Sequence, residues 1–227
     1  MILSHRRSAR PLPSAYGIFR RTVNIMVAAF LVLWLAVSPS KADTLRLLGL
    51  GDSLMAGYGL AKKDSFPTQL ESALKDRGHD VTLLNAGVSG DTTAGGRSRL
   101  AWSLADKPNA VIVELGGNDG LRGLPPKETE KNLRAILQEL KQQGLPVLLT
   151  GMLAPPNMGR AYGAKFNAVF GKLADEFEVV FYPFFLEGVA GEPTLNQPDG
   201  IHPNEEGVKV IVARILPSVE ALLAKVR

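Results

Sequence analysis

Short apolar runs alternate with longer segments of helical periodicity through most of the chain, and this alternation limits the possible folds more than any other feature. In the longer segments, apolar residues recur every three or four positions, as in helices that pack one face on a core. Strands connected by such helices form a parallel sheet with right-handed crossovers and helices on both faces. The five runs with the length of a buried strand are residues 45–50, 81–85, 110–115, 146–150 and 179–182.

Helices are expected between and after these strands. The clearest opens at Pro125-Pro126 and ends at Gly144, since Pro favours a first helical turn and Gly favours a helix end. In the last helix, Pro217 is expected to cause a kink or an interruption. The connection at residues 183–203 has little pattern. The other expected helices are residues 67–77, a helix capped by Asp91 that ends near Leu104, residues 164–176, and a helix that starts near Asn204.

These elements predict an α/β fold with three layers, in which helices cover both faces of a five-stranded doubly wound parallel sheet. We expect the flavodoxin-like strand order 2-1-3-4-5, whose switch point lies between the first and third strands. In such sheets, ligands bind just outside the carboxyl ends of the strands. Residues 51–53, 87–91 and 116–119 follow the first three strands and should converge on one crevice. A chain of 227 residues, 45% of them hydrophobic, suits one well-buried domain, expected at residues 43–227.

The first 42 residues have the composition of an export signal. Arg20 and Arg21 precede an apolar stretch at residues 23–37, and Ser40 and Ala42 put small residues at positions −3 and −1 of a cut. That stretch is shorter than the roughly 20 residues that cross a membrane. We therefore expect a signal peptide at residues 1–42, cleaved near Ala42/Asp43, and a periplasmic or secreted protein with no membrane span after processing. An uncleaved membrane anchor is the alternative.

The net charge of +4 belongs to this N-terminal segment. Residues 1–42 hold six basic side chains and no acidic one, so the remainder has 20 basic and 22 acidic side chains. Nucleic-acid binding, which needs a basic patch on the folded domain, is therefore not indicated. The chain has no Cys, so an exported form relies on its core rather than on disulfides. Nothing in the sequence requires an oligomer, and we expect a monomer.

Ser53 stands where the nucleophile of a doubly wound enzyme would lie. It comes directly after the apolar run at residues 45–50 and the tight turn at Gly51-Asp52. A serine hydroxyl is a weak nucleophile at neutral pH and needs an adjacent base, most often a histidine. The alternative is structural, with Asp52 and Ser53 closing a turn and capping the following helix.

His202 is the base that the sheet topology favours. Of the two histidines after residue 42, His79 precedes the second strand, at the opposite edge of the sheet, and is interpreted as a surface turn residue. His202 follows the last strand, on the same side as Ser53. Asp199 lies three residues earlier, and a turn at Gly200 can bring its carboxylate to the ring nitrogen that faces away from Ser53. The alternative is a helix-entry residue that caps its own loop.

Three N–H donors can stabilise the oxyanion that forms when a serine attacks an ester. They are the backbone N–H of Ser53, the backbone N–H of Gly90 and the side-chain amide of Asn118. Nucleotide binding is disfavoured, since no G-x-x-x-x-G-K-[ST] sequence is present and Gly49-Leu50-Gly51 lacks the third glycine of the dinucleotide motif. A catalytic zinc site needs about three protein ligands, more than Asp199 and His202 supply, so no metal or other cofactor is expected.

Four sequence blocks resemble those of the SGNH, or GDSL, hydrolase family. Their order along the chain and their places after the predicted strands also match that family. Residues 85–92, 113–123 and 183–185 further resemble its periplasmic branch of multifunctional acyl-CoA thioesterases, lysophospholipases and arylesterases. The four blocks are Gly51-Asp52-Ser53-Leu54, Val88-Ser89-Gly90-Asp91-Thr92, Gly116-Gly117-Asn118-Asp119 and Asp199-Gly200-Ile201-His202-Pro203.

The resemblance implies a serine esterase in which Ser53 is the nucleophile, His202 the base and acid, and Asp199 the residue that orients His202. It also implies an oxyanion hole made by Ser53, Gly90 and Asn118, and a mobile loop at residues 121–125 that covers the acyl chain. Expected substrates are small acyl or aryl esters and thioesters, including lysophospholipids, hydrolysed through an acyl-enzyme. The residues expected to line the crevice are Leu54, Met55, Leu121, Arg122, Leu124 and Leu153.

Two other functions stay open at this stage. A carbohydrate acetylesterase of the same family would use the same residues and prefer short acetyl esters. A non-catalytic binding module on this fold would be expected to lack a member of the triad, and none is missing here.

Overall fold

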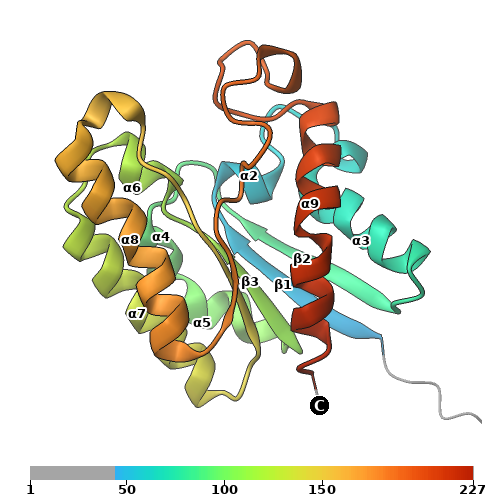
Figure 1. The fold of residues 1–227 in the computed structure, drawn as a ribbon. Helices are drawn as coiled ribbons and strands as arrows, with labels where there is room; N and C mark the ends of the chain where they lie inside the picture. The colour runs from blue at the N-terminus through green and yellow to red at the C-terminus, as the bar shows by residue number, and fades with distance from the viewer. Residues whose placement is uncertain (1–43, 227) are drawn as a thin grey trace, which may run out of the picture. The chain divides into compact units, whose positions relative to one another are not determined.

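A computed structural model describes residues 44–226, so the predicted signal peptide and its cleavage site lie outside the described residues. The five strands form one parallel sheet with the order β2-β1-β3-β4-β5, which confirms the predicted topology. The sheet runs through the middle of the domain (Figure 1). The strands are β1 (Leu45–Gly51), β2 (Val81–Gly87), β3 (Ala110–Glu114), β4 (Val147–Thr150) and β5 (Val180–Tyr182).

Helices cover both faces of the sheet, as a doubly wound fold requires. Figure 1 shows α3 and α9 on one face and α4, α5, α7 and α8 on the other. Among the described residues, no helix is long and apolar enough to cross a membrane. The α-helices are α2 (Ser53–Ala56), α3 (Phe66–Asp76), α4 (Thr93–Ser98), α5 (Leu100–Ser103), α6 (Gly117–Leu121), α7 (Pro126–Gln142), α8 (Arg160–Phe177) and α9 (Glu205–Leu223). Short 3-10 turns occur at Lys62–Asp64, Leu104–Asp106, Pro156–Met158 and Pro193–Leu195.

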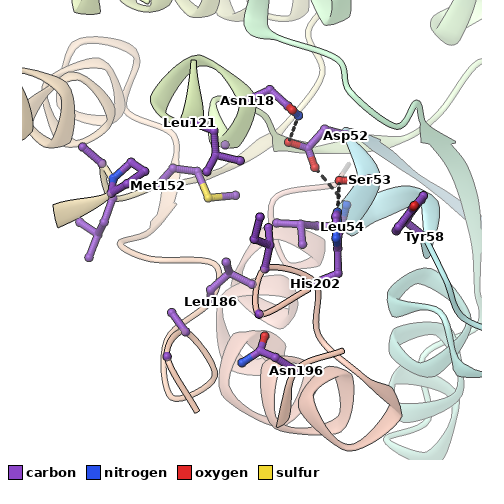
Figure 2. Close-up of a pocket in the computed structure, with 18 of the residues that line it drawn as sticks. Asp52, Ser53, Leu54, Tyr58, Asn118, Leu121, Met152, Leu186, Asn196 and His202 are labelled. Carbon is purple, nitrogen blue, oxygen red and sulfur yellow. Dashed lines mark hydrogen bonds between the residues drawn. The ribbon is translucent and has the colours of Figure 1, made fainter. Parts of the chain in front are cut away.

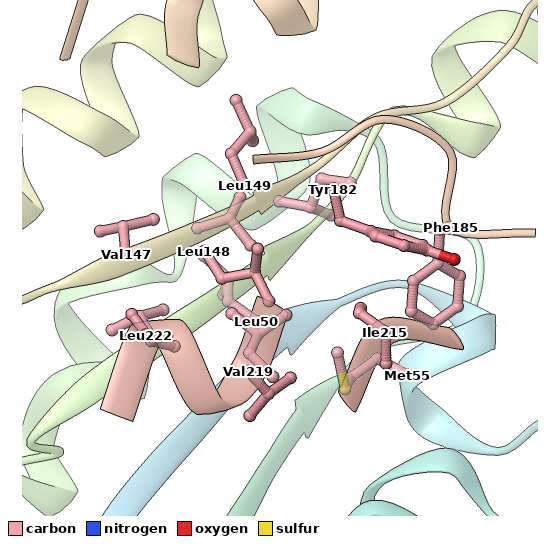
Figure 3. Packing of buried hydrophobic residues seen from close by; sticks show 14 of the residues in the cluster. Leu50, Met55, Val147, Leu148, Leu149, Tyr182, Phe185, Ile215, Val219 and Leu222 are labelled. Carbon is pink, nitrogen blue, oxygen red and sulfur yellow. The ribbon is translucent and has the colours of Figure 1, made fainter. Parts of the chain in front are cut away.

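The core lies between the sheet and α9 on one side and between the sheet and α7 and α8 on the other. Strand β3 is buried along its whole length, which explains why its first four residues are all apolar rather than alternating with polar ones. Figure 3 shows Ile215 and Val219 of α9 against Leu50 and Leu148 of the sheet. Burial of each such side chain stabilises the fold by about 1.5–3 kcal/mol. The sheet is therefore a rigid support for the loops at its carboxyl edge.

The predicted cap of α4 and the predicted interruption of the last helix were wrong. Thr92, not Asp91, caps α4, because the Thr92 hydroxyl accepts from the Gly95 N–H while the Asp91 carboxylate pairs with Arg99 Nε at 2.6 Å. Pro217 does not interrupt the last helix, which continues from Glu205 to Leu223. Buried side chains on both sides of Pro217 hold α9 against the sheet, and this packing outweighs the roughly 3 kcal/mol that an interior proline costs.

Helices also occur where none was predicted or where the boundary was set too late. The short helix α2 forms between β1 and the helix predicted at residues 67–77, where no helix was expected. Helix α8 begins at Arg160, four residues before the predicted start at residue 164, because Gly159 ends the preceding turn with a φ of +83°.

Candidate active site

The sharp turn at the end of β1 places Ser53 at the carboxyl edge of the sheet, where α2 begins. Only glycine fits at Gly51, since a Cβ there would lie 2.5 Å from Glu114 Oε2 and 2.5 Å from Met55 Cβ. Asp52 then caps α2, and its Oδ1 accepts the Leu54 N–H at 3.0 Å. Asp52 therefore holds the turn, while the Ser53 side chain is left to face the pocket (Figure 2).

The structure brings Ser53, His202 and Asp199 together from opposite ends of the domain. His202 Nε2 lies 2.9 Å from Ser53 Oγ, and His202 Nδ1 lies 2.6 Å from Asp199 Oδ2. The second oxygen of Asp199 accepts the backbone N–H groups of Ile201 and His202 at 2.9 and 3.0 Å. The compact turn needs Gly200 in the left-handed region, with a φ of +69°. The loop before α9 thus presents the imidazole to Ser53 and the carboxyl to the far ring nitrogen.

The two acids that flank Ser53 have opposite pKa shifts. The backbone N–H of His202, its ring and the N–H of Ile201 hold the pKa of Asp199 down to about 2. Burial raises the pKa of Asp52 to about 6, against hydrogen bonds from Leu54 and Asn118 that lower it. Asp199 is thus the carboxyl that keeps its negative charge most readily beside the imidazole.

A second acid, Glu114, lies wholly buried beneath the turn. Its Oε2 accepts the Asp52 N–H at 3.2 Å, whereas its Oε1 has no hydrogen-bond partner among the described residues. Burial, and the nearby Asp52, raise the pKa of Glu114 well above its ordinary value. A neutral Glu114 is consistent with this site, because a buried and unpaired charge is costly.

Two of the three predicted oxyanion donors make no hydrogen bond among the described residues, and the third is already engaged. Among residues 44–226, no acceptor lies within hydrogen-bonding reach of the Ser53 or Gly90 backbone N–H. Asn118 Nδ2 instead donates to Asp52 Oδ2 at 3.1 Å (Figure 2) and to the Asp91 carbonyl at 3.0 Å. No local sequence pattern indicates these two acceptors, which lie far from Asn118 along the chain.

A cavity of about 660 Å³ opens beside Ser53 and is lined mainly by apolar side chains. Of the predicted lining residues, Leu54, Leu121 and Leu153 do line it. Its other large apolar side chains, which the sequence reasoning missed, come mostly from the loops after β4 and β5. The apolar run Phe184-Phe185-Leu186, within the connection at residues 183–203, could have indicated that this connection contributes to the cavity. These additional residues are Tyr58, Met152, Phe184, Leu186 and Ile201.

The other three residues predicted for the substrate crevice, Met55, Arg122 and Leu124, do not line this cavity. Met55 is fully buried beneath the turn, with its sulfur against Gly49. Arg122 donates to the Gly90 carbonyl at 2.8 Å and lies outside the cavity. Leu124 is also outside, where its carbonyl accepts the Tyr162 hydroxyl at 2.9 Å. Residue type alone does not distinguish an apolar side chain in the pocket from one in the core.

Two further residues support His202. The Tyr58 ring packs on the imidazole, with ring centroids 4.6 Å apart. Gln197 Nε2 donates to the carbonyls of Tyr58 and Pro203 at 2.8 and 2.9 Å, which ties the loop after α2 to the loop before α9. Within the described part of the chain, no group of three or more His, Asp or Glu side chains could hold a metal ion.

The site contains a serine hydroxyl, an imidazole and a carboxyl, each hydrogen-bonded to the next, at the switch point of a doubly wound sheet. This arrangement defines the class of serine hydrolases on an α/β scaffold. The chain belongs to the GDSL-like lipase/acylhydrolase family, whose model matches residues 50–210. It is therefore a hydrolase that acts on ester bonds.

Named relatives align over nearly the whole chain. Esterase TesA of Pseudomonas aeruginosa is 40% identical over 200 residues, 88% of this chain and 98% of that protein. The thioesterase 1/protease 1/lysophospholipase L1 of Escherichia coli is 42% identical over 195 residues, 86% of this chain and 91% of that protein. The crystal structure of AlinE4, an SGNH-hydrolase family esterase, is 46% identical with a TM-score of 0.68 and covers 81% of this chain and 99% of that one.

Proposed function

We propose that this protein hydrolyses carboxylic esters and thioesters that carry an apolar acyl or aryl group, with Ser53 as the nucleophile. The observation that carries the proposal is the 2.9 Å contact between His202 Nε2 and Ser53 Oγ at the edge of an apolar cavity. The relatives named as esterase, thioesterase and lysophospholipase support the same substrate classes.

In the first half-reaction, Ser53 Oγ attacks the carbonyl carbon while His202 Nε2 takes the hydroxyl proton. The resulting imidazolium is stabilised by Asp199, whose Oδ2 accepts a hydrogen bond from the Nδ1–H group. The tetrahedral intermediate then collapses, the carbon–oxygen or carbon–sulfur bond to the leaving group breaks, and His202 gives its proton to that group. An acyl chain on Ser53 remains in the cavity.

In the second half-reaction, a water molecule takes the place of the leaving group. His202 removes a proton from this water, the hydroxide attacks the acyl-enzyme, and the proton returns to Ser53 Oγ as the acid leaves. The oxyanion of each intermediate is held by the N–H groups of Ser53 and Gly90. Asn118 joins them when one of its two amide N–H groups turns from its present acceptor, the Asp52 carboxyl or the Asp91 carbonyl, toward the oxyanion.

The cavity supports acyl groups longer than acetyl. Its volume of about 660 Å³ falls in the range of pockets that hold drug-sized ligands. Leu54, Leu121, Met152 and Leu186 present apolar side chains to it, and burial of each CH₂ of a substrate there contributes about 0.8 kcal/mol. Acyl chains of intermediate length are therefore expected to be hydrolysed faster than acetyl esters.

Hydrolysis of p-nitrophenyl esters of increasing chain length by the wild type and by Ser53→Ala tests this proposal. The wild type should hydrolyse the series with an optimum beyond acetyl, and Ser53→Ala should lose at least about 10³-fold in kcat. Ser72→Ala, a change on α3 away from the cavity, serves as the matched control and should retain full activity. Equal activity of wild type and Ser53→Ala would overturn the assignment, and activity confined to acetyl esters would favour a carbohydrate acetylesterase.

We further propose that the protein is exported, on the basis of the Arg20-Arg21 pair, the apolar stretch at residues 23–37 and the small residues before Asp43. Expression of the full chain in a Gram-negative host, followed by N-terminal sequencing of the periplasmic fraction, should give a mature chain that starts at Asp43. An intact N-terminus on a membrane-bound protein would favour the uncleaved anchor instead.

A further inference from the structure

Asp119 is a buried acid that the proposed mechanism does not use. Its side chain is 1% exposed and lies at the centre of three hydrogen bonds. Thr93 N–H donates to its Oδ2 at 2.8 Å, the Thr93 hydroxyl donates to its Oδ1 at 2.5 Å, and the Thr129 hydroxyl donates to its Oδ1 at 3.1 Å. One short helix, α6, is thereby joined to the start of α4 and to α7.

The link between Asp119 and Thr93 connects the two segments that supply separate oxyanion donors. Asp119 is the immediate neighbour of Asn118, and Thr93 follows Gly90 by three residues. The strand ends before them do not fix this distance, since β2 and β3 both pair with β1 and not with each other. Contacts between the loops must therefore set it.

The remaining hydrogen bonds between these segments also hold them together. Arg122 donates to the Gly90 carbonyl at 2.8 Å, and Asn118 donates to the Asp91 carbonyl at 3.0 Å. Helix α6 and the residue after it thus form hydrogen bonds with three backbone groups of residues 90–93. Of these three bonds, only the one made by Asp119 is fully buried. Both carbonyls are turned toward this helix while the Gly90 N–H is left without an acceptor among the described residues.

We infer that Asp119 is a positioning residue, which holds the Gly90 N–H at a fixed distance from Ser53 and Asn118 so that the oxyanion hole is formed before substrate binds. This inference rests on the proposed function of Ser53. Preorganised donors stabilise a transition state because no reorganisation is needed at the moment of reaction. Loss of the Thr93 link should therefore lower kcat and leave the ground-state binding of the acyl chain unchanged.

A purely structural role would give a different result, and Thr129 provides the matched control. Thr129→Val removes one buried hydrogen bond to the same carboxyl, but from α7 rather than from the Gly90 segment. Asp119→Ala removes both links. Asp119→Asn is the conservative variant, because its Oδ1 can accept the Thr93 N–H while its amide donates to the two hydroxyls.

The experiment measures kcat and KM for a p-nitrophenyl ester, the rate of covalent labelling by a fluorophosphonate, and Tm, for each variant of the full chain. We expect Asp119→Ala to lose about 30- to 100-fold in kcat and in labelling rate, with KM within about twofold of wild type. Asp119→Asn should recover kcat to within about fivefold of wild type. Thr129→Val should lower Tm and keep kcat within about twofold.

Two results would overturn the inference. One is a kcat of Asp119→Ala within about threefold of wild type after correction for the folded fraction, and the other is an equal loss of kcat in Thr129→Val. If Asp119→Ala does not fold, Thr93→Ala decides: a kcat at least about threefold below that of Thr129→Val supports the positioning role, and an equal kcat refutes it. A wild type that neither hydrolyses esters nor is labelled would instead refute the proposed function of Ser53, and the inference with it.

Discussion

Two turns with the same local design meet at Ser53, and the pKa values of their carboxyl groups are shifted in opposite directions. In each turn an Asp side chain accepts a backbone N–H from a residue that follows it and makes one bond to a functional side chain. Asp52 accepts from Leu54 and Asn118, and Asp199 accepts from Ile201 and His202. Asp52 is 2% exposed, whereas the Asp199 side chain is 38% exposed.

The pKa values follow this difference in exposure and partner. The pKa of Asp52 is raised from 3.8 to about 6, chiefly by burial, and its side-chain partner is the neutral amide of Asn118. The pKa of Asp199 is lowered to about 2 by backbone N–H groups and by an imidazole that can take up a proton. The acid next to Ser53 in sequence therefore holds the turn, and the acid 146 residues after Ser53 is suited to the catalytic role proposed for it.

The largest expected effect comes from Asp199→Asn. The Asn oxygen can keep the Ile201 and His202 N–H bonds, so its amide must donate to His202 Nδ1. That fixes the ring proton on Nε2, which then cannot accept a proton from Ser53. We expect kcat to fall about 10³- to 10⁴-fold with little change in KM, measured on a p-nitrophenyl ester.

The corresponding change at Asp52 is expected to have a much smaller effect on kcat. Asp52→Asn leaves the His202 contacts intact, but its new NH₂ group faces the NH₂ group of Asn118, and the hydrogen bond between the two side chains is lost. We expect kcat to fall only about tenfold. Comparable losses in both variants would contradict the separation of a structural from a catalytic acid.

A smaller effect is expected in the pH dependence of stability. Between about pH 4 and pH 6, the unfolded chain releases the Asp52 proton while the folded protein keeps it, because the folded-state pKa is the higher one. The free energy of unfolding should therefore fall as the pH rises through this window, by up to about 3 kcal/mol from Asp52 alone. Urea unfolding at pH 4 and pH 7 should show a larger loss in wild type than in Asp52→Asn, where only the contribution of the buried Glu114 remains.

Asp199 should give the opposite sign at lower pH. Its folded-state pKa lies below its ordinary value of 3.8, so its stabilising contribution is present above about pH 4 and is lost as the pH falls toward 2. Urea unfolding at pH 3 and pH 5 should therefore show a steeper acid loss in wild type than in Asp199→Asn. Parallel profiles for wild type and either variant would contradict the corresponding pKa shift.

The sequence was sufficient for the sheet and for the meeting of Ser53 with His202. The positions of the carboxyl ends of β1, β2 and β3 are restricted by strand periodicity, right-handed crossovers and the switch-point rule. The large separation of Ser53 and His202 in sequence therefore did not prevent the prediction. The resemblance to the SGNH blocks then picked out Gly90 and Asn118 from the residues at that edge.

Contacts that depend on side-chain choice were not predictable in the same way. Asp91 and Thr92 are both good helix caps, and only the position of Arg99 decides which one caps α4. Met55 and Leu54 are both apolar neighbours of Ser53, yet one points into the core and the other into the cavity. Both outcomes depend on tertiary packing, which a local pattern does not contain.

The smallest expected effect on kcat comes from a change at Gly200, in the turn that carries Asp199. Gly200 has a φ of +69°, and a Cβ added there would meet no atom within 4 Å, so Gly200→Ala would be strained by its backbone conformation alone. Gly144, at the end of α7 and far from the site, has the same φ and the same free space, and it serves as the control. Each change should cost about 1 kcal/mol of stability.

Activity should distinguish the two glycine variants. A shift in the backbone at Gly200 moves the Asp199 carboxyl relative to His202 Nδ1, so kcat of Gly200→Ala should fall about threefold, while Gly144→Ala should keep the wild-type kcat at an equal loss of Tm. Because the Asp199 side chain is partly exposed, its position depends on this turn and on its hydrogen bond to the His202 ring. An unchanged kcat in Gly200→Ala would mean that the bond to His202 holds the carboxyl in place without help from the backbone.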